Sequence, residues 1–203
     1  IIIAAAKLFT SKGYEGTSLT EISEIVCLSN NSGLFRHFKS KEEIYRNVIE
    51  RFIIQEQTPK EKFGDCSGLS LIDFIELYIQ KANKTMNDLS EMPTFREWQE
   101  LMPKEDKGSI KYLMFILEGA KYSDECAKAI SLCTYEEIDL WKEVLENAKQ
   151  KGEILEDIDA HGMAKIFRYS YLGISYSFSM SGGITENNIR DTFYAIYNSI
   201  KRK

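Results

Sequence analysis

Three cations and a histidine, with no carboxylate among them, lie in one short stretch of an otherwise acidic chain. The stretch runs from Gly33 to Lys41 and contains Arg36, His37 and Lys39 besides Lys41 itself. The whole chain has 203 residues and a formal net charge of −5. Contact with phosphate depends on where the cations gather rather than on the net charge. This stretch is therefore a candidate for contact with a nucleic acid backbone.

Small polar residues come directly before the basic stretch, at Ser29, Asn30, Asn31 and Ser32. Short side chains can reach base edges without steric conflict, and asparagine can pair bidentately with adenine. Charge alone would favour a plainer interpretation, in which residues 39–41 are only the solvated start of a helix. The pattern of helices around the stretch favours DNA contact instead.

Three short helices are expected to position these residues. Apolar residues at helical spacing predict a helix from Ile1 to Lys12, and Gly13 ends it. Capping boxes at Ser18–Glu21 and Ser40–Glu43 start two more helices. Two short helices separated by a polar break are typical of a helix-turn-helix, which reads the major groove of DNA.

The first fifty residues resemble the TetR family of one-component bacterial transcriptional regulators. The matching residues are Ala4-Ala5, Leu8-Phe9, Gly13, Thr17-Ser18, Ile22, Leu34-Phe35, His37-Phe38 and Lys39-Ser40-Lys41-Glu42-Glu43. The resemblance implies an all-α fold in which an N-terminal three-helix bundle with a helix-turn-helix joins a larger helical domain for effector binding and dimerisation. We expect the two domains to cover residues 1–50 and 51–203.

The resemblance also implies roles for individual residues. Ser29 to Ser32 would lie at the turn and the start of the recognition helix, and Lys41 would face the DNA backbone. Thr17 or Ser18 would lie at a helix N-terminus, which favours phosphate. Phe35 stands where the family usually has a tyrosine that touches a phosphate. The predicted DNA contacts are Thr17, Ser18, Ser29, Asn30, Asn31, Ser32, Phe35, Arg36, His37, Lys39 and Lys41.

Two features depart from the family pattern. Residues 26–28, Val-Cys-Leu, fill a turn where the family usually has glycine. The distance from Ile22 to Phe38 is also one residue longer than usual. We expect the extra residue within 29–31, so which of these side chains reaches a base stays open.

The remaining chain predicts further helices separated by weak breaks, in agreement with its content of only three prolines. The segment 110–120 is strongly apolar and is expected to be a centrally buried helix. Glu136 and Glu137 lie on a Lys-rich predicted helix, and we interpret them as part of its solvent-exposed face. The expected helices cover about 69–89, 95–101, 110–120, 124–151, 157 or 159 to 179, and 185–203, with Asp157 or Asp159 and Thr185 as the caps of the last two.

Aromatic side chains are frequent in this second region. Most of them must be core, but a helical domain attached to a DNA reader usually senses a ligand, and an aromatic-lined cavity suits an apolar or aromatic effector. Trp98 and Tyr112 are the first candidates, because each has a polar group beside an apolar surface. The predicted effector-binding residues are Phe74, Tyr78, Trp98, Tyr112, Phe115, Trp141 and Tyr171.

The last two predicted helices each carry an apolar stripe, and the resemblance implies that they form a four-helix bundle with a second copy. A two-fold dimer would place two recognition helices about 34–36 Å apart, which matches a palindromic operator. The two stripes consist of Met163, Ile166, Phe167, Ser170, Tyr171, Gly173, Ile174 and Ser177, and of Ile189, Phe193, Ile196, Tyr197 and Ile200.

Catalytic, metal-binding and cofactor motifs are not visible, so we expect neither an enzyme nor a bound cofactor or metal. The four cysteines, Cys27, Cys66, Cys126 and Cys133, form no CxxC pair and predict buried free thiols. The sequence has no secretory signal and no membrane-spanning apolar run, which favours a cytoplasmic protein without a membrane partner. Because it opens on Ile1 without a methionine, we expect a preceding native segment.

These observations predict a ligand-responsive transcriptional repressor. It would bind a palindromic DNA operator as a homodimer and be released by a small apolar or aromatic effector. Two alternatives stay open: a helical ligand-binding protein or enzyme whose helix-turn-helix is vestigial, and a regulator controlled by a protein partner.

Overall fold

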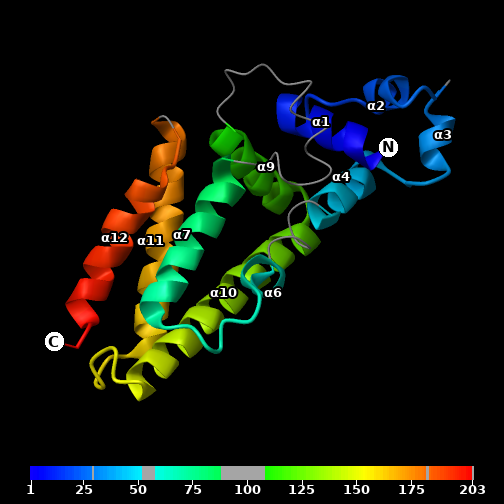
Figure 1. Cartoon of the computed structure of the whole chain (residues 1–203). Helices are drawn as coiled ribbons and strands as arrows, with labels where there is room; N and C mark the ends of the chain where they lie inside the picture. Colours follow the sequence, from blue (N-terminus) through cyan, green and yellow to red (C-terminus); the bar gives the residue numbers. More distant parts are fainter. Residues whose placement is uncertain (29, 52–57, 88–107, 182, 203) are drawn as a thin grey trace. The chain divides into compact units, whose positions relative to one another are not determined.

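The computed structural model describes residues 1–28, 30–51, 58–87, 108–181 and 183–202 (Figure 1). The regular secondary structure of these ranges is helical. Strand-like pairing within them is limited to an isolated bridge between Ile154 and Lys201. The predicted all-α fold is therefore confirmed. The chain forms two compact units, one of residues 1–56, 90–106 and 111–131, the other of 57–89, 107–110 and 132–203.

The first unit contains four short helices together with the end of one longer helix and the start of another. Its helices are α1 (Ile2–Lys12), α2 (Leu19–Ile25), α3 (Ser32–Phe35), α4 (Lys41–Ile49), the end of α9 (Gly108–Tyr122) and the start of α10 (Asp124–Gln150). α1 packs against α4 and α2, and α2 packs against α3. The buried rings of Phe9 and Tyr45 meet edge to face, with centroids 4.8 Å apart, and join α1 to α4.

Helix ends in this unit follow their local signals. Gly13 ends α1 with a φ of 75°. Ser18 and Glu21 form the predicted capping box at α2. Ser40 caps α4 by accepting the Glu43 backbone N–H at 3.1 Å, while the Glu43 carboxylate accepts the N–H of Lys39 at 2.5 Å. The predicted end of α1 and the predicted starts of α2 and α4 are confirmed, although the Glu43 carboxylate bonds Lys39 rather than Ser40, so the predicted capping box of α4 is incomplete.

Cys27 adopts the left-handed backbone conformation in the turn after α2, with a φ of 56°. Glycine tolerates this region without a steric penalty, whereas a side chain raises its energy. The backbone at this turn thus has the conformation that favours glycine, although the residue is a cysteine.

The second unit contains α6 (Pro59–Phe63), α7 (Leu71–Asn87), most of α10, α11 (Ala160–Met180) and α12 (Glu186–Ile200). α12 packs against both α7 and α11, and these three helices run side by side in Figure 1. Asp159 and Thr185 cap the last two helices with their side chains. Both caps are where the sequence predicts a helix start.

The core of the second unit is aromatic. The Trp141 ring of α10 stacks on Phe167 of α11 at 4.4 Å, with an angle of 3° between the planes. Phe74 of α7 and Phe193 of α12 meet the same indole edge to face at 4.6 and 5.6 Å. All four side chains are fully buried, so these rings hold four helices together.

A carboxylate closes the N-terminus of α7. Glu153, just after α10, accepts the backbone N–H groups of Leu71 at 2.8 Å and Ile72 at 3.0 Å. Its Oε1 also accepts the hydroxyl of Tyr197 at 3.3 Å. The carboxylate therefore supplies the α7 cap from a distant part of the chain.

The structure corrects two sequence-based expectations. The apolar helix α9 is not centrally buried over its described side chains, because Met114 and Leu117 are 55% and 59% exposed. All four cysteines are free thiols, but only Cys66 and Cys126 are buried, whereas Cys133 is half-buried and Cys27 is exposed. The predicted helix 95–101 lies outside the described residues.

None of the helices described is long and apolar enough to cross a membrane. Within the same residues, His, Cys, Asp and Glu side chains form no group of three or more that could hold a metal ion.

Candidate functional site

The basic stretch forms an exposed surface around α3. Arg36, His37 and Lys39 are exposed, and Phe35 is 53% exposed. Within the described part of the chain, the side chains of Arg36 and Lys39 make no ion pair or hydrogen bond. Their charges are therefore available to a phosphate group.

The polar residues before α3 are partly occupied within the chain. The Asn31 amide accepts the Ser23 hydroxyl at 2.9 Å and donates to the Thr20 hydroxyl at 3.4 Å, both on α2. Asn30 accepts the backbone N–H of Ser32 at 2.9 Å. These contacts fix the start of α3 on α2, and leave the exposed Ser32 hydroxyl facing solvent. Ser29 lies outside the described residues.

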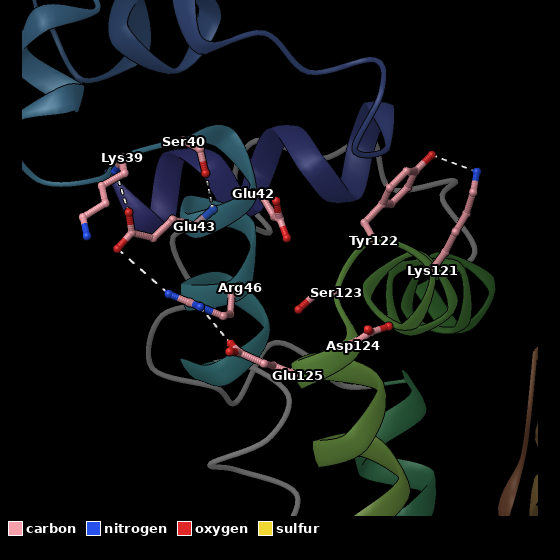
Figure 2. A pocket seen from close by; sticks show the side chains of 10 residues that line it. All are labelled: Lys39, Ser40, Glu42, Glu43, Arg46, Lys121, Tyr122, Ser123, Asp124 and Glu125. Atoms are coloured by element: carbon pink, nitrogen blue, oxygen red, sulfur yellow. Dashed lines mark hydrogen bonds and ion pairs between the residues drawn. The ribbon is translucent and has the colours of Figure 1, made fainter.

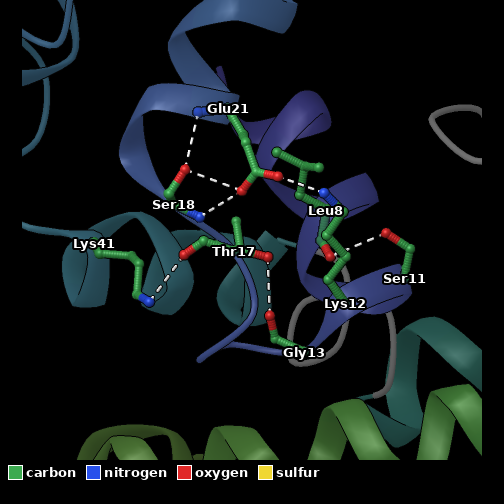
Figure 3. Close-up of polar contacts among 8 residues, drawn as sticks. All are labelled: Leu8, Ser11, Lys12, Gly13, Thr17, Ser18, Glu21 and Lys41. Carbon is green, nitrogen blue, oxygen red and sulfur yellow. Dashed lines mark hydrogen bonds and ion pairs between the residues drawn. The ribbon is translucent and has the colours of Figure 1, made fainter.

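Thr17 and Lys41 tie α4 to the connection between α1 and α2 (Figure 3). Thr17 is 1% exposed and its hydroxyl donates to the Gly13 carbonyl at 2.9 Å. The Lys41 ammonium donates to the carbonyls of Tyr14 at 2.8 Å and Thr17 at 3.0 Å, and lies 4.2 Å from the Tyr14 ring centroid. Sequence reasoning missed these internal roles, since they depend on contacts between residues 24 and 27 positions apart. DNA contact by these two residues stays a prediction.

Ser18 is occupied as the cap of α2. Its backbone N–H donates to the Glu21 carboxylate at 2.9 Å, and its hydroxyl accepts the Glu21 N–H at 3.1 Å (Figure 3). The Lys12 ammonium donates to the same carboxylate. The Lys12 hydrogen bond, followed by those from Ser18, lowers the pKa of Glu21 to about 2. The Glu21 carboxylate therefore already accepts the donors at this helix end, and its negative charge would repel a phosphate there.

The ends of α9 and α10 contact the same small bundle. The Glu118 carboxylate accepts the Tyr14 backbone N–H at 3.0 Å, and the ring of Tyr122 stacks on Tyr14 at 4.5 Å. Arg46 of α4 lies 2.8 Å from the Glu125 carboxylate. The first unit therefore includes residues far along the chain, which no local pattern predicts.

A polar pocket of about 640 Å³ opens between the start of α4 and the junction of α9 and α10 (Figure 2). It contains cations such as Arg46 and Lys121 but also the carboxylates of Glu42, Glu43 and Glu125. Arg46 faces Glu125 at 2.8 Å and Glu43 at 4.0 Å. Lys39 of the basic stretch also lines the pocket, but the four carboxylates of Glu42, Glu43, Asp124 and Glu125 outnumber its three cations, so the pocket does not favour phosphate.

Four of the predicted effector-binding residues come together in the second unit. The ring centroid of Tyr78 lies 5.0 Å from that of Trp141 and 5.4 Å from that of Tyr171. The ring centroid of Phe74 lies 4.6 Å from that of Trp141. All four are buried. Trp98 lies outside the described residues, as do the side chains of Tyr112 and Phe115 on α9.

A buried ion pair adjoins this aromatic group and was missed by sequence reasoning. The Tyr78 hydroxyl donates to Glu137, and Arg168 lies 3.3 Å from the same carboxylate oxygen. Glu137 is 3% exposed, so its interpretation as a solvated face is wrong. Its spacing of four residues from both Cys133 and Trp141 places it on the inner face of α10, and this periodicity could have revealed it.

The ion pair is strongly desolvated. Burial raises the pKa of Tyr78 well above its usual value, and the neighbouring Glu137 charge acts in the same direction. Burial would lower the pKa of Arg168, but the adjacent Tyr78 and Glu137 outweigh it, so the pKa is raised and the guanidinium stays charged. Burial likewise raises the pKa of Tyr171 to about 12.

Comparison with known proteins gives a family match at the N-terminus. Residues 1–48 match the family described as bacterial regulatory proteins, tetR family. Over 50 residues the chain is 48% identical to the biofilm operon icaADBC HTH-type negative transcriptional regulator IcaR of Staphylococcus epidermidis. That match covers 25% of this chain and 26% of the relative, so it spans about a quarter of the curated protein's length.

Solved structures share the fold over nearly the whole chain. A putative transcriptional regulator from Saccharomonospora viridis in complex with choline is 12% identical with a TM-score of 0.72, covering 100% of this chain and 96% of that one. AibR in complex with isovaleryl coenzyme A and operator DNA is 18% identical with a TM-score of 0.61, covering 98% and 95%. At these identities the likeness concerns the fold alone.

Proposed function

We propose that this chain, whose first 48 residues match the TetR family of bacterial regulatory proteins, is a transcriptional repressor of that family that binds a palindromic operator as a homodimer. The observation that carries the proposal is the exposed basic surface around α3. Arg36 ends α3 and Lys39 follows it, between the capped helices α2 and α4, and no ion pair within the described residues neutralises them. Such a surface fits phosphate contact beside a groove.

The DNA contacts divide by chemistry. Arg36, Lys39 and the neighbouring His37 contact phosphates, whereas Ser32 contacts a base edge. Phe35 has no hydroxyl and is half exposed, so it makes an apolar contact such as that with a thymine methyl group. Asn31 acts indirectly, because its amide holds α3 on α2.

The homodimer forms through α11. Its exposed apolar side chains recur at spacings of three and four residues and so lie along one face of the helix. Gly173 is also exposed on this helix, with open space where a Cβ would stand. Phe167, Tyr171 and Ile174 of the stripe predicted on α11 are buried within the chain, so the exposed face of this helix differs from the predicted one. The stripe predicted on α12 contributes less to the interface, because Ile189, Phe193 and Ile200 are also buried within the chain. The exposed apolar side chains of α11 are Ile166, Tyr169, Leu172, Tyr176 and Met180.

A small effector binds in the second unit and releases the operator. Regulation of this kind requires two conformations, one that fits DNA and one that does not. The effector must have the higher affinity for the conformation that does not fit DNA. The aromatic group of Phe74, Tyr78, Trp141 and Tyr171 is the candidate for its apolar part. Two proteins of the same fold were solved with choline and with isovaleryl coenzyme A, the second also with operator DNA.

The test is selection of binding sites from random-sequence duplex DNA by the purified protein at two salt concentrations. We expect a palindrome whose two halves are about one helical turn apart, with an affinity that falls as salt rises. Recovery of no motif, or of a single half-site only, would contradict the proposed dimeric operator reader.

A further inference from the structure

Buried hydrogen-bond donors without partners gather around Tyr78 in the second unit. Arg168 is 8% exposed, and its Nη1 lies 3.3 Å from Glu137 and 3.4 Å from the Tyr78 hydroxyl. Its Nε is buried without a hydrogen-bond partner, and so is Nε1 of Trp141, whose ring lies 5.0 Å from that of Tyr78. Buried donors in native proteins are nearly always paired, so the unpaired Nε of Arg168 beside the Tyr78 hydroxyl marks the place of an absent acceptor.

The same place carries surplus positive charge. Lys62 of α6 lies over the rings of Phe63, Tyr78 and Tyr171, at 5.2, 5.9 and 5.9 Å from their centroids. In the described part of the chain its ammonium makes no hydrogen bond or ion pair. Lys62 is half-buried, and desolvation lowers the pKa of its ammonium, while the nearby Glu137 carboxylate acts in the opposite direction. Lys62 and Arg168 thus face the single negative charge of Glu137.

The chemistry of these groups defines the missing acceptor. A guanidinium with a free Nε matches a carboxylate, which accepts hydrogen bonds from a planar fork of donors. The ammonium of Lys62 adds a point charge. The surrounding rings of Tyr78, Tyr171 and Phe63 are apolar and suit a hydrocarbon body attached to that carboxylate.

We propose that the effector is a small carboxylic acid with an aliphatic or aromatic body, whose carboxylate binds between Arg168 and Lys62. This inference rests on the proposed function, since it names the class of its effector. The bound carboxylate competes with Glu137 for the guanidinium. It thereby weakens the ion pair that joins α10, which carries Glu137, to α11, which carries Arg168.

The first experiment compares acids with amides of the same shape. Thermal unfolding of the full chain is followed with hexanoate or hexanamide, phenylacetate or phenylacetamide, and acetate, at pH 7 and constant ionic strength. We expect hexanoate and phenylacetate to raise the Tm while the amides and acetate leave it unchanged. Amides as effective as the acids, or no effect of either acid, would overturn the proposal. An equal effect of acetate would overturn it too, because a simple anion site needs no hydrocarbon body.

The second experiment uses three variants in calorimetric titration with the acids. Lys62→Met should weaken acid binding about tenfold or more, since it removes a charge and leaves no carboxylate unpaired in the described residues. Glu137→Gln should strengthen it, because the competitor for Arg168 becomes neutral while its shape is kept. A merely structural ion pair would make Glu137→Gln less stable without improving acid binding.

Lys60→Met is the matched control, because Lys60 is an exposed lysine on the same short helix α6. It should bind the acids as the wild type does. Equal acid affinities in the wild type, Lys62→Met and Glu137→Gln would refute the site. Circular dichroism checks that each variant is folded.

Operator binding separates this inference from the proposed function. Hexanoate or phenylacetate should weaken binding to the selected palindrome. A protein that binds the palindrome but ignores both acids would refute the effector class alone. A protein that binds the acids at Lys62 yet selects no palindrome would refute the operator reader alone.

Discussion

Both ends of the Asn31 amide are hydrogen-bonded to α2, so we assign the proposed DNA contacts to its neighbours. Ser32, Arg36 and Lys39 are exposed, and their side chains have no partner within the described part of the chain. The Lys41 ammonium instead donates hydrogen bonds to two backbone carbonyls of the same bundle. Some polar residues of this region thus hold its helices together, and others stay exposed and available for the proposed DNA contacts.

Replacing Cys27 by glycine should stabilise the protein. The residue has a φ of 56°, where glycine avoids a steric cost of about 1 kcal/mol that any side chain incurs. We expect a gain of that order in the free energy of unfolding, measured by urea denaturation. Cys27→Ala is the control, since it removes the thiol but keeps the Cβ, and should give no such gain. A lower stability of Cys27→Gly would contradict the backbone explanation.

Glu21 should titrate near pH 2 in an NMR titration of its carboxyl carbon. Lys12→Met should move that midpoint towards the ordinary value of about 4.3, because the Lys12 hydrogen bond is the largest cause of the shift. The folded-state pKa is lowered, so the stabilisation by this pair is complete above the unfolded pKa and is lost as the pH falls towards 2. A wild-type midpoint near 4, or one that ignores Lys12→Met, would refute this assignment.

Among the elements, α7 depends on a cap that comes from the end of α10. The Glu153 carboxylate accepts two backbone N–H groups at the start of α7, where the helix dipole also favours a negative charge. Glu153→Gln should therefore cost about 1–2 kcal/mol of unfolding free energy. Glu156→Gln is the matched control, because Glu156 is exposed nearby and should change stability little. Equal effects of the two variants, by urea denaturation, would refute the capping role.

Local signals predict the ends of elements, whereas contacts between distant residues do not follow from them. Ser18, Ser40 and Thr185 cap their helices as predicted, because each cap bonds a residue only three positions away. Glu137 and Arg168 pair across 31 positions, and nothing in a local window specifies such a partner. The exposed basic stretch was predictable for the same reason as the caps, since its residues are adjacent in sequence.

For the molecule as a whole, the apolar face of α11 sets the expected assembly. Tyr176→Glu should place a charge in the proposed dimer interface and yield monomers in sedimentation velocity experiments, with operator affinity reduced about a hundredfold or more. The control is Tyr135→Glu, at a tyrosine of α10 that is 60% exposed, close to the 58% of Tyr176. Dimers in both variants would contradict assembly through α11.

The central claim is that the surface around α3 reads DNA, and its most direct test is the affinity of Arg36→Ala for the selected operator at several salt concentrations. Lys128→Ala serves as the control, since Lys128 is an exposed lysine of α10 in the same unit. We predict a loss of affinity for Arg36→Ala alone, with a salt slope smaller by about one per subunit. Arg36→Ala binding as tightly as the wild type, with the same salt slope, would contradict the account.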